Sequence, residues 1–200
     1  MINKLVRIAL AVALLSFGTA VFADTFPVPI TNGSFETGDF TGWTQFGDTS
    51  FNGVCQTSTC PLNFAPYAGT YAAYFGPVGD TGGIYQDIST VVGQEYTLTF
   101  FLANQAGGIP NFFEAQFGNA DFTMTDFPVA FGWTQFTLTD TATSTTTRLE
   151  FTFRNDPGYW FLDNLSATTQ GGTTPEPGTF VLFGSGLLGV AGVIRRKFRA

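Results

Sequence analysis

The sequence contains no histidine and only two cysteines in 200 residues. Without histidine there is no Ser-His-Asp triad, no Cys-His pair and no histidine-bound metal, so most hydrolytic active sites are excluded. Two cysteines without histidine cannot form the common zinc sites either. No glycine-rich phosphate loop joins a predicted strand to a helix, which argues against nucleotide binding. The chemistry left open is binding, or catalysis by carboxylates alone.

Basic residues are nearly absent from the middle of the chain. Six of the eight lie close to the two ends, and residues 24–174 keep only Arg148 and Arg154. The same stretch holds fourteen of the fifteen acidic residues, and these two positive and fourteen negative charges give a formal charge of −12. A surface of this sign repels nucleic acid and anionic headgroups and attracts divalent cations. DNA and RNA are therefore excluded as partners.

The first 23 residues have the pattern of a signal peptide. Lys4 and Arg7 precede an apolar segment over residues 8–17, and Val21-Phe22-Ala23 supplies a small residue at a cleavage site. The alternative, an uncleaved membrane anchor, is disfavoured because the apolar segment is short. We therefore predict export and cleavage by signal peptidase after Ala23.

The end of the chain combines a linker, an apolar run and a basic cluster. Residues 170–177 form a Gly/Thr-rich linker that ends in the PEP motif, residues 178–194 carry no charge, and residues 195–200 are basic. Seventeen helical residues span about 26 Å, which is at the short end for a membrane helix. The alternative is a buried core helix, but the run has no polar face. We predict a transmembrane helix over 178–194 with a cytoplasmic basic tail.

This order of features resembles the PEP-CTERM sorting signal of Gram-negative bacteria that make extracellular polysaccharide. The residues that carry the resemblance are Pro175, Glu176, Pro177, Arg195, Arg196 and Lys197. The resemblance implies that exosortase recognises the tail and processes the protein near the PEP motif. It also implies a transient stay in the inner membrane, followed by release to the cell surface or extracellular matrix.

The two cysteines lie close together, at Cys55 and Cys60. In an oxidising compartment, such a pair most simply forms a local disulfide that fixes one loop. A redox-active pair usually has two intervening residues and a following helix, and neither is present here. The sequence therefore predicts a structural disulfide.

Residues 24–169, called the body below, have the composition and patterning of an all-β domain. They are rich in Thr, Phe, Gly and Tyr, and short alternating runs are separated by Gly, Asn, Asp and Pro. This pattern predicts an antiparallel jelly-roll β-sandwich with phenylalanine filling much of the core. The expected strands are 30–35, 43–46, 70–75, 83–88, 94–104, 112–117, 120–125, 132–139, 148–154 and 160–168.

Both ends of the body resemble galactose-binding-like jelly rolls, a group that includes carbohydrate-binding modules. The opening motif is Asn32-Gly33-Ser34-Phe35-Glu36 with Gly42-Trp43, and the closing strand is Phe161-Leu162-Asp163-Asn164-Leu165-Ser166. The resemblance implies that Glu36 and Asp163 ligate a structural calcium ion, with backbone carbonyls completing the oxygen shell. In the alternative, Glu36 caps a turn and Asp163 only accepts backbone hydrogen bonds.

Aromatic side chains are the candidate polysaccharide-binding groups, because sugar-binding sandwiches stack aromatic rings on pyranose faces. Strict alternation places Trp133 on the face opposite Phe136 and Leu138. Trp160 follows Pro157-Gly158-Tyr159, so we place Trp160 and Tyr159 at a loop edge. The alternative for each tryptophan is burial in the core.

The sequence thus predicts a non-enzymatic, surface-sorted protein that binds polysaccharide. A secreted carbohydrate-active enzyme that uses two paired carboxylates is the alternative.

Overall fold

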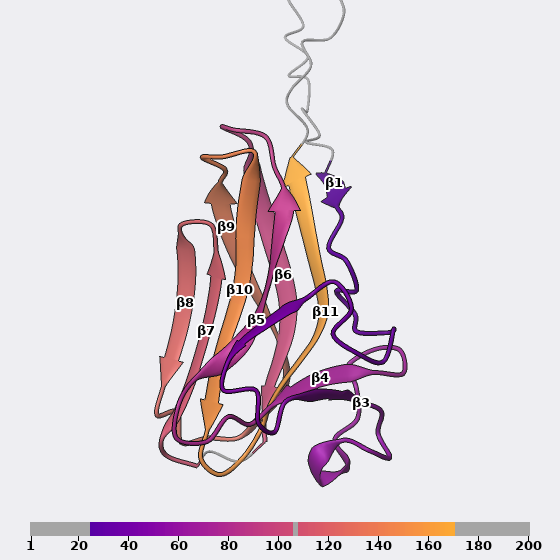
Figure 1. Cartoon of the computed structure of the whole chain (residues 1–200). Helices are drawn as coiled ribbons and strands as arrows, with labels where there is room; N and C mark the ends of the chain where they lie inside the picture. The colour runs from indigo at the N-terminus through magenta and orange to yellow at the C-terminus, as the bar shows by residue number, and fades with distance from the viewer. Residues whose placement is uncertain (1–24, 106–107, 171–200) are drawn as a thin grey trace, which may run out of the picture. The chain divides into compact units, whose positions relative to one another are not determined.

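The structure is a computed structural model that describes residues 25–105 and 108–170. Two antiparallel sheets lie face to face, with the five-stranded sheet in front in Figure 1. The all-β sandwich predicted from the patterning of the body is therefore confirmed. The predicted signal peptide (1–23), transmembrane segment (178–194) and basic tail (195–200) lie outside the described residues. Within the described part of the chain, no helix has the length and apolar character needed to cross a bilayer.

The six-stranded sheet has the strand order β3-β4-β11-β6-β9, and β1 also pairs with β11. Its strands are β1 (Thr25–Val28), β3 (Gly53–Cys55), β4 (Ala72–Phe75), β6 (Glu95–Asn104), β9 (Phe131–Thr141) and β11 (Trp160–Gln170).

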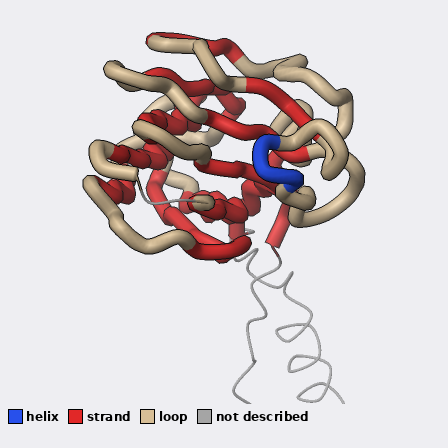
Figure 2. The backbone as a smooth tube through the Cα atoms, turned by 90° about the horizontal axis from the view of Figure 1, so that it is seen from below, coloured by secondary structure: helices blue, strands red, loops and turns tan. Residues whose placement is uncertain are grey.

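The five-stranded sheet has the strand order β2-β5-β10-β7-β8. Its strands are β2 (Thr44–Gly47), β5 (Gly82–Ser89), β7 (Asn111–Phe117), β8 (Ala120–Thr125) and β10 (Thr146–Asn155). The 3-10 turn η1 (Pro61–Asn63) is the helix drawn in blue in Figure 2.

Phenylalanine side chains fill the space between the two sheets. Phe75 and Phe153 stack with ring centroids 3.9 Å apart, and Phe100 meets Phe151 edge to face at 5.1 Å. These four residues come from both sheets and are fully buried. Aromatic pairs of this kind add to the stabilisation from burial of their apolar surface. The alternation of buried residues with half-buried or exposed ones along β6 and β10 supplies the inward-facing rings.

The prediction of a first strand over residues 30–35 is wrong, because this segment is a turn. Asn32 and Phe35 have φ angles of 51° and 56°, which a strand does not allow. Gly33 lies so close to β11 that a Cβ atom there would be 2.6 Å from the carbonyl oxygen of Leu165. The first strand is instead β1, and the three-residue strand β3 was not predicted.

The predicted disulfide between Cys55 and Cys60 is present, with the two Cα atoms 4.8 Å apart. Both cysteines are buried, and they pack with Ala103 and Phe161 on the side of the six-stranded sheet that faces away from the core. The disulfide closes the loop that follows β3 and fixes it against this outer face.

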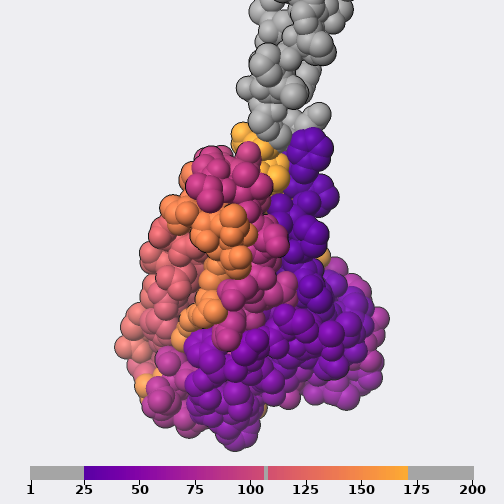
Figure 3. Space-filling model, turned by 45° about the horizontal axis from the view of Figure 1, so that its top comes forward, coloured from indigo at the N-terminus to yellow at the C-terminus, as the bar shows by residue number. Residues whose placement is uncertain are grey.

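The first and last described residues are neighbours. Thr25 of β1 pairs with Gln170 of β11, and Val28 pairs with Ala167. In Figure 3 these two segments, indigo and yellow, lie side by side at one end of the body. Entry to and exit from the body are therefore at the same place.

Candidate functional site

Aromatic side chains gather on the outer face of the six-stranded sheet, under the loop that carries the disulfide. We call this group the outer aromatic cluster. Its members are separated from the main core by the sheet itself, and they come from β4, β6, β9, β11 and the loops beside them. The cluster consists of Phe64, Tyr67, Tyr74, Phe101, Trp133, Tyr159 and Phe161.

Trp133 is the tryptophan of this cluster. It lies on β9 on the opposite side from Phe136 and Leu138, which pack against the main core. Its indole nitrogen donates a hydrogen bond to the carbonyl oxygen of Ala65 at 2.9 Å. This bond fixes the ring while leaving the residue half-buried, so part of the indole remains at the surface.

Tyr67 provides the most exposed ring of the cluster, with 42% of its surface accessible. The ring stacks on Phe101 of β6, with centroids 3.6 Å apart and an interplanar angle of 16°. It also meets Trp133 edge to face, with centroids 6.1 Å apart. One face of the Tyr67 ring is therefore covered by Phe101, and other parts of the residue remain accessible to solvent. Tyr67 and Trp133 together form what we call the aromatic platform.

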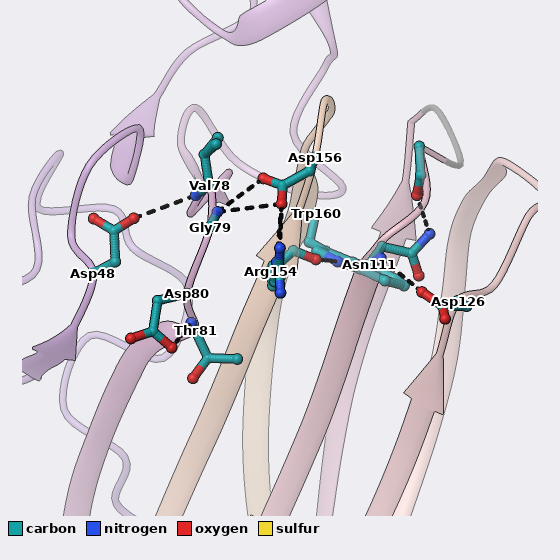
Figure 4. A network of polar contacts seen from close by, with 11 residues as sticks. Asp48, Val78, Gly79, Asp80, Thr81, Asn111, Asp126, Arg154, Asp156 and Trp160 are labelled. Carbon is teal, nitrogen blue, oxygen red and sulfur yellow. Dashed lines mark hydrogen bonds and ion pairs between the residues drawn. The ribbon is translucent and has the colours of Figure 1, made fainter.

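Trp160 does not belong to this site, and its predicted place at an exposed loop edge is wrong. It is the first residue of β11 and is fully buried against Phe113 and Phe131. Its indole nitrogen donates to the carbonyl oxygen of Arg154, as Figure 4 shows. Successive residues of a strand point to opposite faces. The half-buried Tyr159, one residue earlier, therefore contacts the outer aromatic cluster while Trp160 enters the core.

The two carboxylates predicted to ligate calcium both bind the backbone of the loop that carries Tyr67. The Asp163 side chain accepts bonds from the amides of Tyr67 and Ala68 at 3.0 and 3.1 Å. Glu36 accepts bonds from the amides of Thr70 and Tyr71 at 2.9 and 3.0 Å. The loop over residues 67–71 is thus held by side chains from the opening turn and the closing strand of the body.

Burial of Asp163 sets the electrostatics of this region. The residue is fully buried, and this burial raises the pKa of its carboxyl from 3.8 to about 6. The backbone bonds oppose the rise, and the negative charge of Glu36 adds to it. The two arginines of the body pair with Asp87 and Asp156. No arginine of the described residues therefore forms an ion pair with Asp163.

The outer face of the five-stranded sheet has a different character. Register and burial place six charged side chains on it, and Arg148 also lies over the ring of Tyr85 at 3.9 Å. Arg148 forms an ion pair with Asp87 at 2.9 Å. The charged residues of this face are Asp87, Glu114, Asp121, Arg148, Glu150 and Arg154.

Sequence reasoning missed the contacts that assemble the aromatic residues into one site. Phe101 lies in a strand whose alternation was recognised, but its outward direction gave no sign that a ring would stack on it. Tyr67 lies 34 residues away in a loop without regular structure, so no local pattern brings the two together. The backbone amides of residues 67–71 that bind Glu36 and Asp163 carry no side-chain signal at all.

Comparison with known proteins identifies the tail and the fold. Residues 173–197 match the model of the PEP-CTERM protein-sorting motif, which confirms the predicted sorting signal. This motif implies processing by exosortase and indicates export to the surface or the extracellular space. No curated protein sequence matches the chain.

Among solved structures, the body is similar to TmCBM61, which was solved in complex with β-1,4-galactotriose. The TM-score is 0.56 at 17% identity, over 72% of this chain and 99% of that one. It is also similar to the enzymatically active domain of tailspike protein 4 of bacteriophage CBA120, with a TM-score of 0.53 at 15% identity, over 71% of this chain and 21% of that one. A carbohydrate-binding module of the β-sandwich superfamily has a TM-score of 0.50 at 16% identity, over 68% of this chain and 61% of that one. These similarities establish a shared jelly-roll fold.

The raised pKa of Asp163 predicts an unusual dependence of stability on pH. The folded state keeps the carboxyl protonated up to about pH 6, whereas the unfolded chain releases the proton near its ordinary value of 3.8. The contribution of this group to the free energy of unfolding is therefore greatest below pH 3.8 and is lost as the pH rises to about 6. Carboxyls with a lowered pKa, such as Asp48 and Asp87, change the free energy of unfolding only at lower pH, where their contribution is lost as the pH falls.

Urea unfolding of the protein and of Asp163→Asn, measured from pH 4 to pH 7 in a chelator, checks this prediction. We expect a decline in the free energy of unfolding for the wild type and a flatter profile for the variant, because an amide does not titrate. Parallel profiles for the two proteins would contradict the assignment to Asp163.

Proposed function

We propose that this protein is exported, sorted by exosortase and retained at the cell surface or in the extracellular matrix, where its body binds polysaccharide. The sorting motif at residues 173–197 supports the destination. Transit through the inner membrane of a Gram-negative bacterium, with residues 178–194 as a transient transmembrane helix, is part of the same proposal. The acidic, lysine-free body excludes nucleic acid as its ligand.

The single observation that carries the binding proposal is the aromatic platform. Tyr67 lies flat on Phe101 while 42% of its surface stays exposed, and Trp133 is held beside it by a hydrogen bond to the backbone. Pyranose rings stack on such faces, while the phenol and neighbouring polar groups satisfy sugar hydroxyls. Because both rings are already fixed before a ligand arrives, little conformational entropy is lost on binding. Tyr159 lies in the same cluster and meets Phe161, which in turn meets Trp133.

The fold supports the same function. TmCBM61, which shares the fold, was solved with a galactose trisaccharide, and the β-sandwich superfamily module is named for carbohydrate binding. Shared fold alone does not transfer a ligand from one protein to another. The proposal therefore depends on the platform, and the neighbours supply only the class of ligand.

Catalysis has weaker support than binding. A glycosidase needs two carboxylates that reach the scissile bond from either side. Beside the platform, Glu36 and Asp163 both bind backbone amides of one loop, and Asp163 is fully buried. Other candidate carboxylates, Glu114 and Asp121, lie on the outer face of the five-stranded sheet, away from the platform. We therefore propose a non-enzymatic role. Release of reducing sugar from the producer's own polysaccharide by the purified protein would establish the alternative of a carbohydrate-active enzyme.

We further propose that Glu36 and Asp163 hold a structural calcium ion. Their negative charges lie close enough for Glu36 to raise the pKa of Asp163. Oδ1 of Asp163 and Oε2 of Glu36 each accept a single hydrogen bond, so each retains acceptor capacity. Among the described residues no cluster of three acidic, histidine or cysteine side chains could complete a site, so backbone carbonyls would have to contribute.

Removal of the aromatic platform tests the binding function. On a glycan array we expect the wild type to bind and the double variant Tyr67→Ala/Trp133→Ala to lose at least about tenfold in affinity. Each aromatic contact contributes about 0.5–1.5 kcal/mol, and a loss of about 1.4 kcal/mol is a tenfold loss in affinity. Tyr85→Ala, which removes a tyrosine from the other outer face, is the matched control and should bind as the wild type does. If the wild type binds no glycan, the binding proposal fails, and the assignment of the sorting signal is unaffected.

Calcium binding has a thermal signature. A ligand that binds only the folded state raises the unfolding midpoint with its concentration. We expect a higher midpoint in excess calcium than in chelator for the wild type, and no difference for Glu36→Gln/Asp163→Asn. Equal midpoints in calcium and chelator for the wild type would remove the metal from the proposal.

The sorting proposal predicts the fate of the tail. Mass spectrometry of the mature surface protein should find no peptide from residues 195–200, because processing near the PEP motif removes them. Substitution of Pro175 and Pro177 by alanine should retain the protein in the membrane fraction. A surface form that still carries Arg195 and Arg196 would show that the tail is an anchor and not a signal.

A further inference from the structure

The outer face of the six-stranded sheet continues beyond the aromatic platform as rows of hydroxyl-bearing side chains. The register of β11, β6 and β9 aligns Thr168, Thr97 and Thr139 in one row. The next row contains Ser166, Thr99 and Thr137. We call these six residues the hydroxyl rows.

The hydroxyl rows lead directly into the platform. One step further along the same strands, the third row contains Asp163, Phe101 and Gln135. Phe101 is the ring that supports Tyr67, and Gln135 is exposed beside it. Neighbouring strands are about 4.8 Å apart and alternate residues about 6.8 Å, so the rows and the platform form one continuous surface.

Charge distinguishes this surface from the rest of the molecule. The body has a formal charge of −12, and the outer face of the other sheet carries six charged side chains. The two hydroxyl rows carry none, and Asp163 in the third row is fully buried. The charged residue of this face is the exposed Glu95 of β6, which pairs with Thr141 at the far end of the rows. Threonine is common on exposed strands because it favours β structure. That preference explains threonine in general, but the charged residues on the opposite sheet show that this fold does not require an uncharged outer face.

We propose that the hydroxyl rows and the aromatic platform form one extended site for a linear, neutral polysaccharide. This inference rests on the polysaccharide-binding function proposed above and specifies its ligand. A threonine or serine hydroxyl both donates and accepts hydrogen bonds, which suits the hydroxyls of a sugar chain. Thr97 and Thr139 already lie with their Oγ1 atoms 3.4 Å apart, so their hydroxyls form a paired group.

The same features disfavour other ligands. The rows provide no arginine or lysine for an anionic polymer, and the acidic body repels one. Protein interfaces are built around aromatic, methionine and arginine anchors, which the rows lack beyond the platform. A neutral chain that stacks one sugar on Tyr67 and extends its hydroxyls along β6 and β9 uses both parts of the surface.

Ligand length provides a test that needs no substitution. With the purified protein and β-1,4-galacto-oligosaccharides or xylo-oligosaccharides from disaccharide to hexasaccharide, affinity should continue to rise beyond the disaccharide, since longer chains reach the rows. Polygalacturonate, an anionic polymer, should bind at least about tenfold more weakly than neutral galactan or xylan. Affinity that reaches its maximum at the disaccharide, or tighter binding of polygalacturonate, would overturn the extended neutral site.

A matched pair of charge variants locates the site. Thr99→Glu/Thr137→Glu places two carboxylates in the hydroxyl rows, and we expect affinity for the longest neutral oligosaccharide to fall at least about tenfold. Thr123→Glu/Thr125→Glu adds the same charge to exposed positions of β8 on the opposite outer face. This control should change the affinity for that oligosaccharide less than about twofold. Circular dichroism and the thermal midpoint report whether each variant folds.

The outcomes separate the two proposals. If Tyr67→Ala/Trp133→Ala abolishes binding and Thr99→Glu/Thr137→Glu does not affect it, the extended site is wrong and the platform remains. If both glutamate pairs weaken binding equally, the effect is one of net charge and the extended site is wrong. If the wild type binds only polygalacturonate, the extended neutral site is wrong and the binding function remains. If it binds no polysaccharide of either kind, both proposals fail.

Discussion

The buried carboxylate of Asp163 connects three parts of the chain that are far apart in sequence. It comes from the closing strand, binds the amides of Tyr67 and Ala68, and acts together with Glu36 from the opening turn. A buried charge is costly unless hydrogen bonds satisfy it, so its presence constrains the loop to a single conformation. The position of the aromatic platform therefore depends on residues outside the outer aromatic cluster.

The sequence predicted the elements of this fold better than their connections. Alternation in 94–104 and 148–154 predicted β6 and β10 because the central inward-facing positions of each strand carry apolar residues. It failed at 30–35, where Asn32 and Phe35 need positive φ angles, and close packing of Gly33 against Leu165 enforces the turn. Trp160 was misplaced because Pro157-Gly158-Tyr159 indicated a loop edge. At the first residue of a strand, alternation alone does not show which face the side chain takes. The contact of Tyr67 with Phe101 is long-range, and no local pattern encodes it.

The two outer faces of the sandwich differ in the charge that they carry. Charged side chains, including the arginine–aspartate pair at Arg148, concentrate on the five-stranded sheet. The outer face of the six-stranded sheet instead carries rings, hydroxyls and an amide, with one carboxylate, Glu95, at its far end. Its disulfide-closed loop covers part of the aromatic surface. A surface needs charge to stay soluble, but the charge need not be uniform. The uneven distribution leaves most of one face free of the strong hydration that charged groups impose.

The pairing of Thr25 with Gln170 has a mechanical consequence. A pull applied at Gln170 acts lengthwise along β11, which is bonded to β1 and β6 over that region. Hydrogen bonds in antiparallel sheets run perpendicular to the strands, so such a pull loads many of them at once in shear. They do not open one after another. If the body is tethered through this end while its outer face binds a polymer, the load passes along β11, which pairs with β1, β4 and β6.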